Sequence, residues 1–358
     1  MNQAVSNEVF PGGVLLVSVA GSEIFFQAYG YANIFSGRPM TKDTVFDLAS
    51  FTKPLATTLA VTKLISQQKL ELGQHLESIL TRFNGTDKGR ISIENLLYHN
   101  SGFPDYRPYY KVLCNLEPHL RKDALKELLV KEPLINSPGK QVIYSDIGFM
   151  ILCWVIEQVS GNRLDRFVTK EIYHPLGLED LFFVELDSIP RQVKFAATEF
   201  CSWRNMLLEG VVHDDNAYVV GGIQGHAGLF GTAQDVLCLL SELMTAYLDS
   251  PCTGVFNTDL IQLFFKHQEH TGRALGFDTP SPTGPSCGRY FSKYTVGHLG
   301  FTGTSFWMDL DRNVIIILLT NRVHPSRTNN KIKAFRPKVH DRVMKALINK
   351  RLGDSITN

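Results

Sequence analysis

The sequence is poor in cysteine and has no long hydrophobic run. Its 358 residues include only 6 cysteines, and no two of them have the Cys-x-x-Cys spacing of many zinc sites. We therefore predict neither a zinc centre nor a dense disulfide scaffold, and we expect most cysteines to be reduced packing residues. The longest apolar run, residues 149–156, is far too short to span a membrane.

The sequence also lacks a large excess of positive or negative residues. Lysine and arginine number 36 against 35 aspartates and glutamates, for a formal net charge of +1. This balance gives no reason to expect nucleic acid or an anionic membrane as partner, so we expect a small-molecule or peptide substrate. The first ten residues lack a basic segment followed by an apolar one. Without such a segment the chain is expected in the cytoplasm, and in the periplasm or outside the cell only if a signal was removed.

Several common catalytic and binding motifs are missing. The glycine-rich residues 221–228 are not followed by Lys-Ser or Lys-Thr, which argues against phosphate binding. His213, Asp214, Asp215 and His226 look superficially like metal ligands but lack a recognised ligand spacing. We predict no metal and no cofactor.

The strongest local signal is the segment 46–53, Phe-Asp-Leu-Ala-Ser-Phe-Thr-Lys, which leads into a stretch expected to be helical to about Gln68. If this turn is helical, Ser50 and Lys53 share a face. A serine hydroxyl is a weak nucleophile at neutral pH, and a buried lysine with a lowered pKa can serve as its base, so we predict that Lys53 is buried and that its pKa is lowered. Pro54 disfavours the α conformation at Lys53, and such broken local rules concentrate at functional sites.

The Ser-x-x-Lys pattern alone is weak evidence. It occurs at residues 50–53, 66–69 and 137–140, and at each place it is also compatible with a turn that carries a solvated lysine. The first copy is distinguished by its order and its separation from two later segments taken together. We therefore expect the other two copies to lie away from Tyr144 and His298.

The predicted secondary structure places strands at the two ends of the chain and helices between them. Hairpins are expected at residues 14–20 with 24–32 and 297–310 with 314–320. Residues 70–130 carry mostly helical signals, residues 210–231 suggest a long loop, and further helices are expected at 145–156, 162–173, 232–248 and 331–350. We predict an α+β fold, with one antiparallel sheet built from both ends, flanking helices and an inserted mainly helical lobe. The sheet domain would comprise 1–69 and 226–358, and the lobe 70–225.

Three segments line up along the chain: Ser50-x-x-Lys53, Tyr144-Ser145-Asp146 and the His-Leu-Gly of residues 298–300. Together with residues 10–12, 96–102 and 297–304, this order resembles the serine β-lactamase and penicillin-binding-protein superfamily. The resemblance is strongest to the branch of class C β-lactamases, D-alanyl-D-alanine carboxypeptidases and related esterases. It covers nearly the whole chain.

The resemblance implies a serine hydrolase that forms an acyl intermediate on Ser50. Lys53 would be its base or proton relay, and Tyr144 would shuttle protons, because a phenol acts as a base only when a neighbouring cation stabilises the phenolate. The backbone N–H groups of Ser50 and Phe301 would form the oxyanion hole. The substrate would be an ester, a β-lactam or a D-peptide amide. The alternative is a penicillin-binding or sensor protein that does not turn over.

Two positions depart from the family pattern. Asp146 stands where many relatives have asparagine, which adds a carboxylate, although Asp146 or Ser145 could also simply cap the helix that follows. The third motif, commonly Lys-Thr-Gly or His-Thr-Gly, here reads His298-Leu299-Gly300. Leu299 has no hydroxyl for a substrate carboxylate, so we expect esters to be turned over better than β-lactams. The nearby candidates for supplying the missing contact are Thr302, Thr304 and Arg322.

Overall fold

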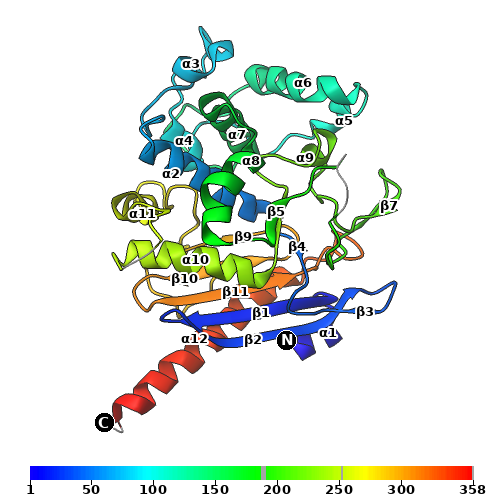
Figure 1. Ribbon diagram of the computed structural model, residues 1–358, viewed down its shortest axis with the longest axis vertical. Helices are drawn as coiled ribbons and strands as arrows, with labels where there is room; N and C mark the ends of the chain where they lie inside the picture. The colour runs from blue at the N-terminus through cyan, green and yellow to red at the C-terminus, as the bar shows by residue number, and fades with distance from the viewer. Residues whose placement is uncertain (187–190, 251–252, 357–358) are drawn as a thin grey trace.

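Both ends of the chain supply strands to one antiparallel sheet, as predicted (Figure 1). The computed structural model describes residues 1–186, 191–250 and 253–356. The six-stranded sheet has the order β3-β2-β1-β11-β10-β9. Its strands are β1 (Gly12–Val19), β2 (Ser22–Asn33), β3 (Arg38–Pro39), β9 (Thr295–Leu299), β10 (Ser305–Asp309) and β11 (Val314–Thr320). The antiparallel pairing of β1 with β11 joins the two ends in the middle of the sheet.

The prediction of one strand over residues 297–310 is wrong, because the chain reverses inside that range. Strands β9 and β10 pair antiparallel and are joined by a turn at residues 300–304. Gly303 has a φ of 115°, and its N–H donates to the carbonyl of Gly300 at 3.1 Å. A side chain at this position would collide with Arg322. The reversal therefore depends on glycine, which alone adopts such a φ freely.

The alternation of side chains along the central strands gives the sheet two apolar faces. One face, with Leu15 and Ile316, packs against α12 (Ile332–Ile356) and α1 (Asn2–Ser6). The opposite face, with Leu16 and Ile317, belongs to the large core shared with the other helices, which lie on the far side of the sheet from α1 in Figure 1. Helix α10 (Ala233–Tyr247), which begins after the N-cap Thr232, contacts this face directly.

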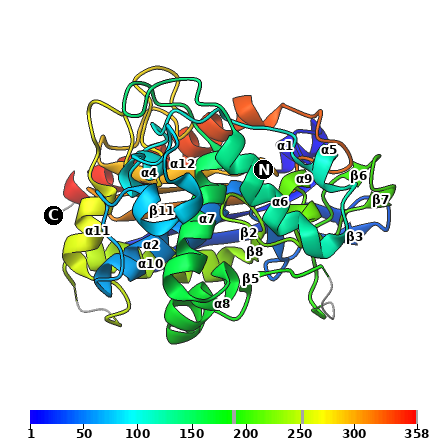
Figure 2. The same ribbon diagram turned by 90° about the horizontal axis from the view of Figure 1, so that it is seen from above.

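Helices fill the middle of the chain less completely than predicted. Between residues 70 and 225 the longest are α6 (Pro118–Lys131) and α7 (Asp146–Ser160), both visible from above in Figure 2. The other α-helices of this range are short, and residues 98–109 contain no helix. These short helices are α3 (Leu76–Ile79), α4 (Ile93–Leu97), α5 (Tyr110–Leu113), α8 (Leu164–Val168) and α9 (Asp215–Val219). Helix α11 (Thr258–Phe265) follows α10.

Strands also occur between the two ends, contrary to the prediction. Strands β4 (Phe46–Asp47), β8 (Leu229–Gly231) and β5 (Leu181–Phe183) form a small antiparallel sheet, and β6 (Phe200–Cys201) pairs with β7 (Met206–Leu207). The expected loop at 210–231 therefore contains both α9 and β8. Strands of two or three residues are too short to show a period of two, so the sequence pattern could not reveal them.

The segment after Ser50 is not one regular helix. A 3₁₀ turn (Ala49–Phe51) is followed by a π-helical turn (Lys53–Thr58) and only then by α2 (Leu59–Ser66). Pro54 lacks an N–H group and its ring crowds the preceding turn, which disfavours regular α-helical bonding at this place. The expectation of one helical stretch to about Gln68 is therefore corrected, and the irregular turn includes Lys53.

Three further observations concern the chain as a whole. The cysteines that the structure describes are free; Cys252 lies outside the described residues. None of the described helices is both long and apolar enough to cross a membrane. The division into a sheet domain (1–69 and 226–358) and a helical lobe (70–225) remains our proposal.

Candidate active site

Ser50 follows a residue in a strained conformation. Ala49 has a φ of 49°, in the left-handed region that non-glycine residues rarely adopt. The buried carboxylate of Asp47 holds this turn, because it accepts from the N–H of Ala49 at 2.8 Å and from the N–H of His213 at 2.7 Å. Such strain persists only where the surrounding contacts over-determine it, and it clusters at functional sites.

Lys53 is fully buried and directs its ammonium group at three acceptors. Nζ lies 3.1 Å from Ser50 Oγ, 3.1 Å from the carbonyl oxygen of His226 and 2.7 Å from Asp146 Oδ1. The prediction that the Lys53 pKa is lowered is wrong. Burial by itself lowers that pKa, but the contacts with Asp146 and Tyr144 outweigh burial and raise it above its usual value. Lys53 is therefore a cation in the resting site.

Tyr144 lies beside Ser50 and Lys53, as predicted. Its phenol interacts with both side chains, and Lys53 Nζ lies 4.8 Å from the centre of its ring. The residue is 36% exposed and borders a cavity. Burial raises the pKa of the Tyr144 phenol, while the Lys53 cation opposes that change. The resting residue is thus a neutral phenol.

The start of α7 fixes Tyr144 and Asp146 relative to each other. Ser145 is the N-cap, because its hydroxyl accepts from the N–H of Gly148 at 3.2 Å. The N–H of Ser145 in turn donates to Nδ1 of His99 at 2.9 Å, and the His99 ring packs against Tyr144 with centroids 4.7 Å apart. Asp146 is the first helical residue, so its carboxylate points to Lys53 rather than capping the helix.

The third motif lies on the other side of Tyr144, at the end of β9. The His298 ring is buried 5.8 Å from the Tyr144 ring, and its Nδ1 donates to the carbonyl of Leu299 at 2.8 Å. Burial lowers the pKa of His298 to about 4, so this imidazole is neutral. Leu299 is partly exposed, and the buried Gly300 accepts from Arg336 at 2.7 Å.

Phe301 follows in the turn and is 51% exposed. Its ring stacks on His213 with centroids 5.5 Å apart. In the part of the chain that the structure describes, neither the N–H of Phe301 nor that of Ser50 donates to a protein acceptor. Both groups are therefore available to a ligand oxygen.

A cavity of about 410 Å³ opens beside Ser50. It brings together four of the predicted site residues, namely Ser50, Tyr144, Asp146 and Phe301, whereas His298, Leu299 and Gly300 are not among its lining residues. The rest of its wall comes from residues that the resemblance did not assign: Ala49, Asp105, Tyr106, His213, Asp214, Asp215, His226, Ala227 and Arg327.

The four residues considered as metal ligands form polar pairs instead. His226 Nε2 lies 2.9 Å from Asp214 Oδ1, and His213 Nε2 lies 3.2 Å from Glu199. The described residues contain no group of three or more metal-ligating side chains arranged around one point. The signal that could have placed these residues in the site is the long glycine-rich loop, since such loops often carry function.

The residues proposed to replace the hydroxyl missing at Leu299 are already engaged, so that expectation is corrected. Thr302 donates to the carbonyl of Asp47 at 2.8 Å, and Thr304 donates to that of Leu48 at 3.3 Å. Arg322 donates to the carbonyl of Phe301 at 2.8 Å. All three side chains are buried and stabilise the turn that carries Phe301.

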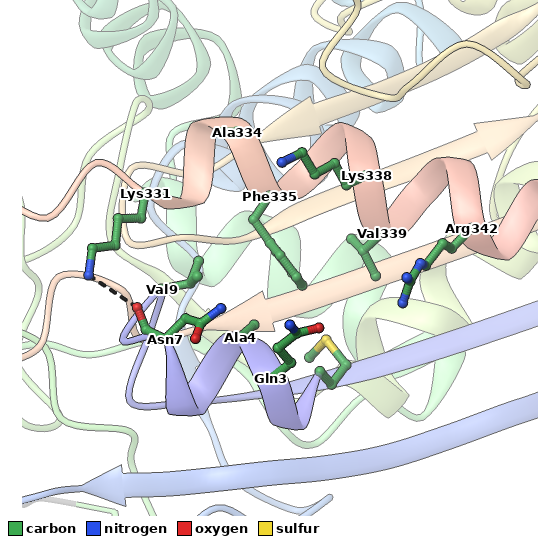
Figure 3. Close-up of a pocket in the computed structure, with 11 residues that line it drawn as sticks. Gln3, Ala4, Asn7, Val9, Lys331, Ala334, Phe335, Lys338, Val339 and Arg342 are labelled. Atoms are coloured by element: carbon green, nitrogen blue, oxygen red, sulfur yellow. Dashed lines mark hydrogen bonds between the residues drawn. The ribbon is translucent and has the colours of Figure 1, made fainter.

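The two other Ser-x-x-Lys copies lie outside this cavity. The serines and lysines of 66–69 and 137–140 are exposed, and the cavity wall does not include them. A second hollow, of about 460 Å³, lies between α1 and α12 (Figure 3). The rim of this second hollow is cationic, with Lys331, Lys338 and Arg342. Ser50 lines the first cavity and not this one.

The chain belongs to the beta-lactamase family, because the family model described as "Beta-lactamase" matches residues 1–338. The predicted membership of the serine β-lactamase and penicillin-binding-protein superfamily is thereby confirmed. The chain is 32% identical to a protein of Escherichia coli (strain K12) named "Putative D-alanyl-D-alanine carboxypeptidase", over 90% of this chain and 82% of that protein. It is 33% identical to "N-acetylmuramyl-L-alanine amidase" of Bacillus subtilis (strain 168), over 88% and 78%.

Solved structures support the same fold. "EstCE1, a hydrolase with promiscuous acyltransferase activity" has a TM-score of 0.71 at 23% identity, over 92% of this chain and 96% of that one. A penicillin-binding protein from Bacillus halodurans has a TM-score of 0.69 at 22% identity, over 93% and 96%. The protein thus has the fold of a hydrolase family whose relatives are named carboxypeptidase and amidase.

Proposed function

We propose that the protein is a serine hydrolase that cleaves an ester or amide through an acyl intermediate on Ser50. The observation that carries this proposal is the 3.1 Å contact of Ser50 Oγ with Lys53, beside Tyr144 and at the wall of an open cavity. A nucleophile next to groups that move protons is the arrangement that covalent catalysis requires. The names of the carboxypeptidase and amidase relatives support an amide as substrate, and the EstCE1 neighbour supports an ester.

Asp146 changes the proton relay, because it keeps Lys53 charged. As Ser50 Oγ attacks the carbonyl carbon, its proton passes to Lys53, and Lys53 passes a proton across the 2.7 Å contact to Asp146. Tyr144 donates its phenol proton to the leaving oxygen or nitrogen as the bond to the carbonyl carbon breaks. The resulting phenolate is stabilised by the Lys53 cation.

Hydrolysis of the acyl intermediate reverses these transfers. Water attacks the acyl carbon and gives a proton to the Tyr144 phenolate. The released Ser50 oxygen recovers a proton from Lys53, and Lys53 recovers one from Asp146. The N–H groups of Ser50 and Phe301 stabilise the negative oxygen in both steps, and losing one such donor typically costs roughly a hundred- to a thousand-fold in rate.

Intact-mass measurement tests the nucleophile and the substrate class together. The protein is incubated separately with a penicillin and with a nitrophenyl ester. We expect an adduct of acyl mass on the wild type, none on Ser50→Ala, and a wild-type adduct on Ser66→Ala, the matched control in a second Ser-x-x-Lys. An adduct on Ser50→Ala would overturn the assignment. One stoichiometric burst without further turnover would instead support the alternative, a binding or sensor protein.

A further inference from the structure

The cavity beside Ser50 has more carboxylates on its wall than the neighbouring cations neutralise. Four aspartates line it, Asp105, Asp146, Asp214 and Asp215. Asp146 is paired with Lys53 at 2.7 Å. Asp215 is paired with Arg204 at 2.6 Å and with Arg327 at 3.1 Å. The charges of the remaining two aspartates, Asp105 and Asp214, are therefore not neutralised by these three cations.

Asp105 and Asp214 keep oxygen atoms available to a ligand. Within the described ranges, neither forms an ion pair with a lysine or arginine. Asp105 is exposed, and its Oδ1 accepts from the N–H of Tyr106 at 2.8 Å. Asp214 uses Oδ1 for both its bonds, from the N–H of Ala217 at 2.7 Å and from His226 at 2.9 Å. Burial alone would raise the Asp214 pKa, but His226 holds it well below its usual range, so the carboxylate is ionised.

His226 adds an unpartnered polar atom to the same wall. Its side chain is 1% exposed and borders the cavity. Nε2 lies 2.9 Å from Asp214 Oδ1, so Nε2 carries a hydrogen and donates to that carboxylate. Among the described residues the buried Nδ1 has no hydrogen-bond partner. A buried polar atom without a partner costs free energy, so a ligand that hydrogen-bonds here is favoured.

We propose that the acyl portion of the substrate carries a primary ammonium group, which binds between Asp105 and Asp214, next to His226. A primary ammonium has three N–H donors and no acceptor, which matches the carboxylate oxygens that these two aspartates leave without a donor. Its charge compensates the two carboxylates, whereas a substrate carboxylate at this place would be repelled by both. The proposal rests on acylation of Ser50, since the cavity is the same.

Matched esters test this preference. Nitrophenyl esters of glycine, 3-aminopropanoic acid and 6-aminohexanoic acid are each compared with their N-acetyl forms, which keep the chain but remove the charge. We expect at least one free amine to have a kcat/KM about ten- to a hundred-fold above that of its N-acetyl form, the range for a hydrogen bond to a charged group. Added salt should reduce this ratio.

Variants locate the preference on the cavity wall. Asp105→Asn and Asp214→Asn keep an oxygen for the backbone bonds but remove the charge, and each should lower the amine to N-acetyl ratio about ten-fold. Asp123→Asn removes an exposed carboxylate of α6 outside the cavity and should leave the ratio at the wild-type value. A wild-type ratio of one or less, with Ser50 acylated by the N-acetyl esters, would overturn the ammonium site and leave the serine mechanism standing. Acylation by none of the esters would overturn both.

Discussion

At the scale of single residues, Asp146 affects the expected chemistry most. The sequence predicted a buried Lys53 beside Ser50 and Tyr144, and the structure places these three side chains together. It could not predict the direction of the Lys53 pKa shift, because that depends on a 2.7 Å contact with a residue far along the chain. Asp146 was interpreted as a contact for the substrate or a helix cap, and its partner is Lys53 instead.

Replacing this carboxylate tests the relay. Asp146→Asn removes the contact that raises the Lys53 pKa, so burial should lower that pKa. Lys53 must then lose its proton to solvent before it can accept one from Ser50. We expect the acid limb of the pH profile of kcat/KM to move to higher pH than in the wild type. A limb that stays in place or moves to lower pH would show that Asp146 does not take part in the relay.

Leu299 carries a prediction about substrate choice. It stands where the resemblance to the family's common third motif implies a threonine, and Thr302, Thr304 and Arg322 are engaged with the backbone around the turn. We therefore expect wild-type kcat/KM to be higher for a neutral ester than for a penicillin. Leu299→Thr should raise penicillin acylation by roughly ten-fold, the value of one modest hydrogen bond, and neutral ester turnover less. Equal gains for both substrates in stopped-flow assays would contradict this role.

At the scale of elements, the sequence revealed long periodic segments and missed short ones. The first hairpin, α7 and α10 were predictable, because alternation or a buried apolar stretch extends over many residues. The two-residue β4 and the three-residue β8 were not, since their pairing is set by tertiary contacts. This matters for the site, because β4 ends at Asp47, the carboxylate that holds the Ser50 turn.

The turn between β9 and β10 is the element that aims the N–H of Phe301. In Gly303→Ala, the φ of 115° is strained and the new methyl group would lie 2.2 Å from Thr320 and 2.6 Å from Arg322. We expect the free energy of unfolding to fall by about 1–3 kcal/mol or more, and kcat to fall with it. Gly37→Ala is the matched control, because its φ is 69° and no atom lies within 4 Å of the added methyl. In urea denaturation and in ester turnover, Gly303→Ala should therefore lose more than Gly37→Ala. Equal losses in the two variants would contradict the role assigned to Gly303.

At the scale of the whole molecule, the site draws on segments from most of the chain. The order of three motifs was enough to predict which segments supply Ser50, Tyr144 and His298. It was not enough to predict the cavity wall, because Asp105 and His226 meet only through the packing of loops without a regular period. Family resemblance therefore predicted the groups that we propose to react, whereas the surface that we propose to select a substrate required the structure.

The same packing buries histidines in their neutral form and so predicts sensitivity to acid. Burial lowers the pKa of His298 to about 4 and that of His340 to about 3, against a usual value near 6.5. Between about pH 6.5 and these folded values the unfolded chain binds more protons than the native chain. The free energy of unfolding should therefore fall as the pH falls, by about 1.4 kcal/mol per pH unit for each such histidine.

Urea denaturation between pH 7.5 and pH 5 measures this slope. His340→Gln removes one buried histidine, so the slope of the free energy of unfolding against pH should decrease by the contribution of about one proton. The slopes are compared rather than the absolute stabilities, because the substitution itself also costs stability. His119→Gln, at an exposed histidine of α6, is the matched control and should keep the wild-type slope. The lowered pKa values of Glu199 and Asp214 act with the same sign, but mainly below the usual carboxyl range, so they do not mask the comparison. Equal slopes in His340→Gln and the wild type would mean that His340 is not buried in its neutral form.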